Sequence, residues 1–179
     1  MKYRIVILIG ILMLFGVLNS EPIRNFTLPD VNNQNVNIAD HIGKGLIVID
    51  FWASWCAPCM QLLPEIEKIH REYEDVKVIT INIDRPRDVN KAKSLLRSQK
   101  YTFTTLFDTN QDVMKQFNVS SIPHTFLISL DGEIVYEHIG YTRGDEAKLT
   151  SEIEELLSLI TKQEVEEKAV IEQECIEEK

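Results

Sequence analysis

Cys56 and Cys59 are the residues best suited to chemistry, because two thiols three positions apart can form and break a disulfide. An apolar, β-branched run from Ile47 to Phe51 predicts a buried strand before them. From Met60 onward, apolar residues recur every three or four positions, which predicts a helix. We therefore expect the pair where a strand turns into a helix, and a helix N-terminus favours the thiolate.

Two other interpretations of this pair are weaker. Half of a zinc site needs two further ligands, but a second cysteine pair is absent and only Cys175 remains. A purely structural disulfide would close a very short loop and would constrain the unfolded chain little. The prediction is a redox-active Cys56–Cys59 disulfide with no metal and no other cofactor.

Length and charge limit the class of protein further. The chain has 179 residues, enough for one domain with a full core, and only three cysteines, too few for a disulfide scaffold. Its formal net charge is −9 and its sequence pI is about 5.0. This acidic balance argues against nucleic acid as a partner.

The first twenty residues have the pattern of a targeting segment. Lys2 and Arg4 precede an apolar run, Ile5 to Leu18, which has signal-peptide length and is short for a membrane span. Cleavage after Ser20 would leave Leu18 at a position that prefers a small side chain, so a retained membrane anchor stays open. Either outcome predicts a periplasmic or otherwise extracytoplasmic domain, which is soluble after cleavage or held by residues 1–20.

The rest of the chain alternates strand and helix patterns. Short strands are expected at 26–30 and 36–38, around an Asn-rich turn, and one helical turn at 39–41. After the strand and helix around the cysteines, the expected elements are strand 76–83, helix 86–100, strand 103–107, helix 110–117, a hairpin from 123 to 136, and a last helix after Asp145 as N-cap. This order predicts an α/β fold with a central mixed sheet flanked by helices. Residues 21–160 form the expected domain, and 161–179 an acidic C-terminal extension.

The stretch around the cysteines, Asp50-Phe51-Trp52-Ala53-Ser54-Trp55-Cys56-Ala57-Pro58-Cys59, resembles the active-site strand and turn of the thioredoxin superfamily. Pro64 matches the proline that kinks the family's first long helix. The N-terminal β extension and the αβ insertion between Asp84 and Asp108 resemble those of periplasmic TlpA/ResA-type thiol–disulfide oxidoreductases. The resemblance covers about residues 22–160 and implies a thioredoxin fold.

The cysteines have distinct expected roles. Cys56, nearest the helix N-terminus and the more exposed of the two, is the expected nucleophile that forms a mixed disulfide with a substrate, and Cys59 resolves it. The resemblance implies a cis bond between Ile122 and Pro123, facing the cysteines. Trp55, Pro58 and this dipeptide are the expected substrate-binding residues.

Asp50 is an ionisable residue on an otherwise apolar strand, so its desolvation suggests a role. The resemblance implies that it helps to move the proton of Cys59. A satisfied polar group at a strand end is the alternative. His124, beside Pro123, is expected to tune the thiols, to contact substrate, or to be a surface strand residue.

Two positions depart from the patterns of the relatives. Thioredoxins pair the buried aspartate with a lysine where this chain has Thr80. ResA-type proteins carry a buried glutamate where this chain has Leu62. These departures weigh against the specialised cytochrome c maturation mechanism in this chain.

The resulting prediction is an extracytoplasmic enzyme of cell redox homeostasis, a thiol–disulfide oxidoreductase that reduces protein disulfides and is re-reduced by a membrane electron donor. A peroxiredoxin-like peroxidase shares the N-terminal segment, but its Pro-x-x-x-Thr-x-x-Cys context is replaced here by Trp55-Cys56-Ala57-Pro58-Cys59. A non-catalytic thioredoxin-fold binding module is the second alternative. The retention of Cys56, Cys59 and Pro123 weighs against it.

Overall fold

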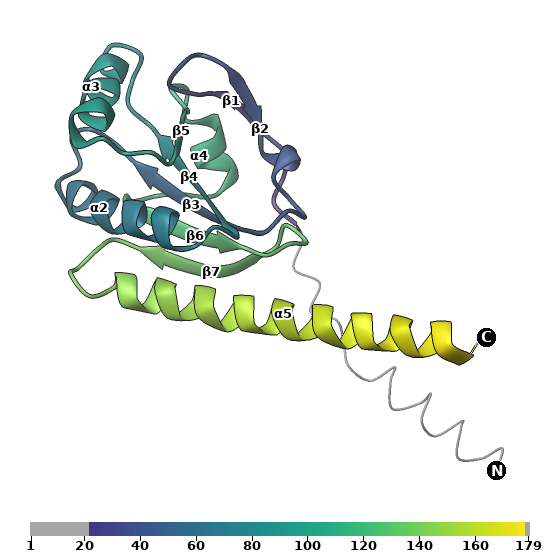
Figure 1. Ribbon diagram of the computed structural model, residues 1–179. Helices are drawn as coiled ribbons and strands as arrows, with labels where there is room; N and C mark the ends of the chain where they lie inside the picture. The colour runs from purple at the N-terminus through teal and green to yellow at the C-terminus, as the bar shows by residue number, and fades with distance from the viewer. Residues whose placement is uncertain (1–21, 178–179) are drawn as a thin grey trace.

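A five-stranded mixed sheet forms the centre of the molecule, a computed structural model that describes residues 22–177 (Figure 1). The strand order is β5-β4-β3-β6-β7; β3, β4 and β5 run parallel, whereas β6 and β7 join antiparallel. The strands are β3 (Leu46–Trp52), β4 (Val76–Asn82), β5 (Thr104–Phe107), β6 (His124–Ile128) and β7 (Ile134–Ile139). The prediction of a mixed α/β sheet is confirmed.

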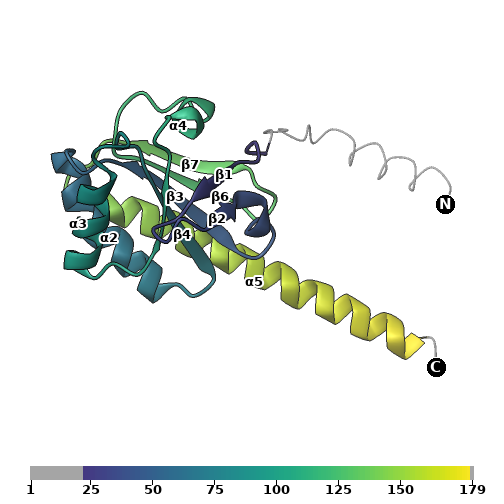
Figure 2. The ribbon, with the colours of Figure 1, turned by 90° about the horizontal axis from the view of Figure 1, so that it is seen from above.

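In the part of the chain that the structure describes, four α-helices connect and cover the strands: α2 (Ala57–Glu72), α3 (Val89–Gln99), α4 (Asp112–Gln116) and α5 (Glu146–Glu177). α2 packs beside α5 on one face of the sheet, and α4 lies on the other side (Figures 1 and 2). α3 begins later than the expected residue 86. Residues 86–88 form a turn instead, in which the Asp88 N–H donates to the Arg85 carbonyl over 2.8 Å.

The N-terminal extension is a small antiparallel pair, β1 (Thr27–Pro29) and β2 (Asn35–Asn37), followed by the 3-10 turn η1 (Ile38–Asp40). The Asp30 carboxylate closes the Asn-rich turn by accepting the N–H groups of Asn32 and Gln34, each over 2.8 Å. A bridge between Asp30 and Leu106 attaches the extension to β5. The β pair therefore covers an edge of the main sheet.

The central strand β3 is buried along its whole length, as its apolar run predicts. Its side chains alternate between the two faces of the sheet. Phe51 points toward α4, where it packs on Phe117 and Phe126 with ring centroids 5.4 and 6.0 Å away. Asp50 points to the opposite face, which α2 and α5 cover. One strand thus supplies both the aromatic core and the buried carboxyl.

The helix α2 contains Pro64, as the resemblance implies. Glu67, on its buried side, accepts the N–H of Thr102 over 2.9 Å and is paired with Arg71 over 2.7 Å. These contacts lower the pKa of Glu67 although burial opposes them. They fix α2, and hence its N-terminus, against the segment that leads into β5.

The last helix, α5, continues through residue 160 without interruption to Glu177. Figures 1 and 2 show its C-terminal part extending beyond the sheet. The division between a domain at 21–160 and an extension at 161–179 stays a prediction. The expected signal peptide or anchor, 1–20, lies outside the described residues. Within residues 22–177, none of the helices combines the length and apolar character needed to cross a membrane.

Candidate active site

Cys56 and Cys59 form a disulfide at the start of α2, with their Cα atoms 5.3 Å apart. Cys56 is the N-cap residue, and its Sγ accepts the N–H of Cys59 over 3.2 Å. Pro58 lies in the first turn, where its missing N–H removes no helical hydrogen bond. One sulfur therefore lies where the unpaired N–H groups and the dipole of a sixteen-residue helix favour negative charge.

The two sulfurs differ in accessibility. Cys56 is 5 % exposed, whereas Cys59 is completely buried. A substrate can reach only the first of them without rearrangement, which agrees with Cys56 as the nucleophile and Cys59 as the resolving thiol. These roles remain predictions.

The residues expected to bind substrate lie around Cys56. Trp55 is 64 % exposed, so its ring lies on the surface, whereas Trp52 is buried in the core. The bond between Ile122 and Pro123 is cis, as the resemblance implies, and the Ile122 carbonyl oxygen lies 3.7 Å from Cys56 Sγ. Ile122 thus lies beside the Cys56 sulfur, and Trp55 directly precedes Cys56 in the chain. The substrate contacts of Trp55, Pro58, Ile122 and Pro123 stay a prediction.

Asp50 is fully buried. Its Oδ1 accepts the Thr125 hydroxyl over 2.8 Å, and its Oδ2 has no hydrogen-bond partner within residues 22–177. Burial raises the pKa of this carboxyl to about 8, although the Thr125 hydrogen bond opposes the shift. The carboxyl is therefore mostly protonated at neutral pH, but a small fraction is ionised and can accept a proton.

Two positions near Asp50 carry uncharged residues: Thr80, where thioredoxins have a lysine, and Leu62, where ResA-type proteins have a glutamate. Thr80 lies beside Asp50 in the β3–β4 register, and its hydroxyl bonds to that of Thr105 over 2.9 Å. Leu62 is buried on α2. Within the described residues, neither side chain is charged or hydrogen-bonded to the carboxyl, so the proton of Asp50 has to travel by another route.

Sequence reasoning missed Asp84, which holds the loop before Cys56. Its Oδ2 accepts the Ser54 N–H over 2.9 Å and the Asn82 side-chain amide over 3.0 Å. Asp84 is completely buried. The only signal was a polar pair, Asn82 and Asp84, closing an otherwise apolar strand.

His124 is buried, so the expectation of a surface strand residue is wrong. Its ring stacks on Phe126 with centroids 4.2 Å apart, and its Nε2 is 2.8 Å from Glu137 Oε1. Desolvation lowers its pKa, although Glu137 opposes the shift. A neutral ring, tied to Glu137 on the α4 side of the sheet, adds no positive charge for a Cys56 thiolate.

The side chain of Asp145, the expected N-cap of α5, accepts a hydrogen bond from the preceding loop and not from the first turn of the helix. Its Oδ2 accepts the Thr142 N–H over 2.7 Å and lies 3.3 Å from His138 Nε2. The chain preceding the helix is thereby folded back onto β7. Within residues 22–177, no three His, Cys, Asp or Glu side chains cluster as metal ligands would.

A family model described as the AhpC/TSA family matches residues 20–137. The chain belongs to the AhpC/TSA family. Among individual relatives, it is 27% identical over 137 residues to the thiol-disulfide oxidoreductase ResA of Bacillus thuringiensis, which covers 76% of this chain and 75% of that protein. It is 25% identical over 126 residues to the sporulation thiol-disulfide oxidoreductase A of Bacillus subtilis, covering 69% and 75%.

Solved structures of other proteins share the fold of this AhpC/TSA member. A thiol:disulfide interchange protein DsbE from Chlorobium tepidum superposes with a TM-score of 0.72 at 28% identity, covering 77% of this chain and 96% of that one. A thioredoxin-like protein from Porphyromonas gingivalis gives 0.65 at 30% identity, covering 76% and 92%. The predictions of a thioredoxin fold and of a thiol–disulfide oxidoreductase are confirmed.

Proposed function

We propose that this AhpC/TSA-family protein reduces disulfides of extracytoplasmic proteins through the Cys56–Cys59 pair and is re-reduced by a membrane electron donor. The observation that carries the proposal is the position of the pair. One sulfur is accessible at the helix N-terminus, beside Ile122 and the exposed Trp55, and the other is buried one turn inside. This asymmetry suits attack on a large substrate by one thiol and release by the other.

The surroundings of Cys56 support the reducing direction. An oxidising pair requires strong stabilisation of the reduced form. Here the contribution that the geometry provides is the α2 N-terminus, with the Cys59 N–H directed at Cys56 Sγ. Desolvation keeps His124 largely neutral, and Ala57 and Pro58 carry neither a charge nor a side-chain donor. The thiolate is therefore stabilised only moderately.

The extracytoplasmic location rests on residues 1–20, whose basic start and apolar run have signal-peptide character. A reductase outside the cytoplasm needs a source of electrons there. A membrane thiol–disulfide protein that reduces the Cys56–Cys59 disulfide would supply them.

Trapping in cells tests the function most directly. Cys59→Ala should accumulate mixed disulfides between Cys56 and substrate proteins, seen as adducts that disappear when the sample is reduced. Cys56→Ala is the matched control and should trap nothing. Adducts formed through Cys59 in the control would reverse the roles of the two cysteines, and their absence from both variants would contradict the reductase proposal.

The reduction potential tests the direction. Equilibration with a thiol redox buffer of known potential, read by tryptophan fluorescence, should give a value below roughly −200 mV, on the thioredoxin side of the range. A value near about −120 mV, typical of a strong periplasmic oxidant, would contradict the reductase assignment. Peroxide consumption that depends on Cys56 would favour the peroxidase alternative instead.

A further inference from the structure

Asp50 has to exchange its proton with solvent although it is fully buried. We take Asp50 to be the base for Cys59, the role that the thioredoxin resemblance implies and on which the proton route below rests. Because its pKa is about 8, the carboxyl is mostly protonated at neutral pH. It must therefore release this proton before it can accept that of the Cys59 thiol.

The contact between Asp50 and Thr125 indicates where the proton can leave: when Asp50 Oδ1 carries the proton it can donate to the Thr125 hydroxyl, which then gives its own proton to a neighbouring acceptor. Thr125 also lines a small cavity between β6, β7, α2 and α5, which has about 10 Å³ of space for water and is partly open to solvent. That volume is about the size needed for one water molecule. The apolar part of the wall is formed by Leu62 and Leu149.

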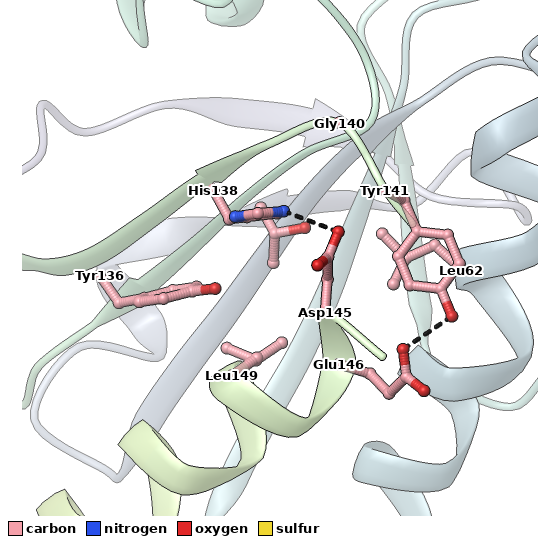
Figure 3. Close-up of a pocket in the computed structure, with 9 residues that line it drawn as sticks. Leu62, Tyr136, His138, Gly140, Tyr141, Asp145, Glu146 and Leu149 are labelled. Atoms are coloured by element: carbon pink, nitrogen blue, oxygen red, sulfur yellow. Dashed lines mark hydrogen bonds and ion pairs between the residues drawn. The ribbon is translucent and has the colours of Figure 1, made fainter. Parts of the chain in front are cut away.

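Tyr136 lines this cavity and brings a buried polar group, its hydroxyl, into it. It is 8 % exposed, and its hydroxyl has no hydrogen-bond partner within the described chain. Figure 3 shows the hydroxyl directed into the space between His138, Asp145 and Leu149. A buried hydroxyl without a partner destabilises the folded protein, so a bound water molecule is the expected compensation.

The outer side of the cavity leads to solvent. His138 Nε2 lies 3.3 Å from Asp145 Oδ2, and these side chains are 31 % and 37 % exposed. The Tyr141 hydroxyl donates to Glu146 over 2.8 Å, closing the neighbouring wall (Figure 3). The cavity thus has a buried inner side at Thr125 and a half-exposed outer side at His138 and Asp145.

The titratable groups facing the cavity are Tyr136 and His138 on β7, Tyr141 and Asp145 in the loop that follows it, and Glu146 at the first position of α5. Lys148 lies over the Tyr136 ring, 5.8 Å from its centroid. α2 contributes Leu62 and β6 contributes Thr125, neither of which titrates in this range. Burial, with Asp145 and Glu152, raises the pKa of Tyr136, so its hydroxyl stays protonated and can both donate and accept.

We propose that this cavity is the proton exit of Asp50, and that Tyr136 positions the water that carries the proton from the Asp50–Thr125 pair to His138 and Asp145. The Asp50 proton leaves through this route to solvent. The carboxylate then takes the Cys59 thiol proton while the Cys59 sulfur attacks Cys56 in the mixed disulfide. The Cys56–Cys59 disulfide forms, and the substrate leaves as a thiolate that takes a proton from solvent.

Stopped-flow measurement of mixed-disulfide release at pH 7, in H₂O and D₂O, tests the route with the full chain. Tyr136→Phe should slow release by about tenfold, the size expected when one hydrogen bond is lost from the rate-limiting transfer. It should also enlarge the solvent isotope effect and leave alkylation of Cys56 and the melting temperature unchanged. Tyr101→Phe, which removes a hydroxyl far from the cavity, is the matched control.

Thr125 gives a second test that does not depend on Tyr136. Thr125→Ser keeps the hydroxyl and should release substrate at nearly the normal rate, whereas Thr125→Val should be slow. Normal release by Tyr136→Phe, or equal rates for the two Thr125 variants, would overturn the exit route. If Asp50→Asn is slow in that case, the base role stands without this route; if it is also normal, the base role itself fails.

Discussion

The two faces of the central sheet are built from alternate residues of the same strands and have opposite character. On the α4 side, the rings of Phe51, Phe117 and Phe126 pack edge to face or tilted, with centroids 5.3 to 6.0 Å apart. On the α2 and α5 side, Asp50 and Thr125 occupy the adjacent positions of the same paired strands. That side also holds the small cavity and the unpartnered Tyr136 hydroxyl.

The two faces therefore contribute to different properties, one to the stability of the fold and the other to proton transfer. The aromatic face is apolar and closely packed, and such burial is the dominant stabilising contribution to folding. The face beneath Cys59 keeps a carboxyl away from water, which destabilises the folded protein but brings its pKa close to working pH. Changes on the first face should therefore alter stability alone, and changes on the second should alter proton transfer.

Phe126→Ala should produce the largest loss of stability. Removing a fully packed ring from the aromatic face should lower the free energy of unfolding by about 3–5 kcal/mol. Urea denaturation of the oxidised protein measures it, and Phe126→Leu provides a milder change. Ile139→Ala, at a 53 % exposed position of β7, is the control and should change stability by less than about 0.5 kcal/mol. A similar small effect for Phe126→Ala would contradict the division between the faces.

Asp50→Asn should increase stability in a pH-dependent manner. The carboxyl has a pKa of about 8 in the folded protein against an ordinary value of 3.8, so the folded state binds more protons between these values. Stability of the native protein therefore falls as pH rises through this window, by about 1.4 kcal/mol per pH unit, and levels off above it.

Urea denaturation at pH 5, 6, 7 and 8 should show the advantage of Asp50→Asn growing with each step. Asp88→Asn, which removes an exposed carboxylate, is the control and should leave the pH dependence unchanged. An equal slope in the native protein and in Asp50→Asn would mean that Asp50 is already ionised in the folded state.

Trp55→Ala should have the smallest effect on stability, because the ring is 64 % exposed and belongs to neither face. A change within about 0.5 kcal/mol is expected. The rate of reaction with a protein disulfide should fall several-fold, while the rate with a small disulfide stays the same. An equal loss with both substrates would mean that Trp55 acts on the thiol rather than on substrate binding.

Local patterns in the sequence predicted the strand and the helix that hold the two cysteines. The run Ile47–Phe51 gave the buried strand, and the spacing after Met60 gave the helix whose first turn holds the cysteines. These features depend on neighbours along the chain, so alternation and helical spacing reveal them. The cis bond before Pro123 depended on the family resemblance.

The hydrogen bonds around this strand and helix depend on contacts between segments that lie far apart in the chain. Thr125 bonds to Asp50 across 75 positions, and Asp84 holds Ser54 across 30. Neither pairing is visible until the strand register is known. The burial of His124 beside Glu137 has the same origin, because the register of β6 and β7 decides which face each side chain takes.

The central claim is that Asp50 accepts the Cys59 proton, and the pH dependence of mixed-disulfide release tests it directly. Stopped-flow traces with a peptide disulfide separate formation at Cys56 from release by Cys59. In the native protein, release should become faster with rising pH and level off near pH 8, the pKa of Asp50. Asp50→Asn should release slowly without that plateau and should form the mixed disulfide at the normal rate. Identical pH profiles for release in the two proteins would contradict the account.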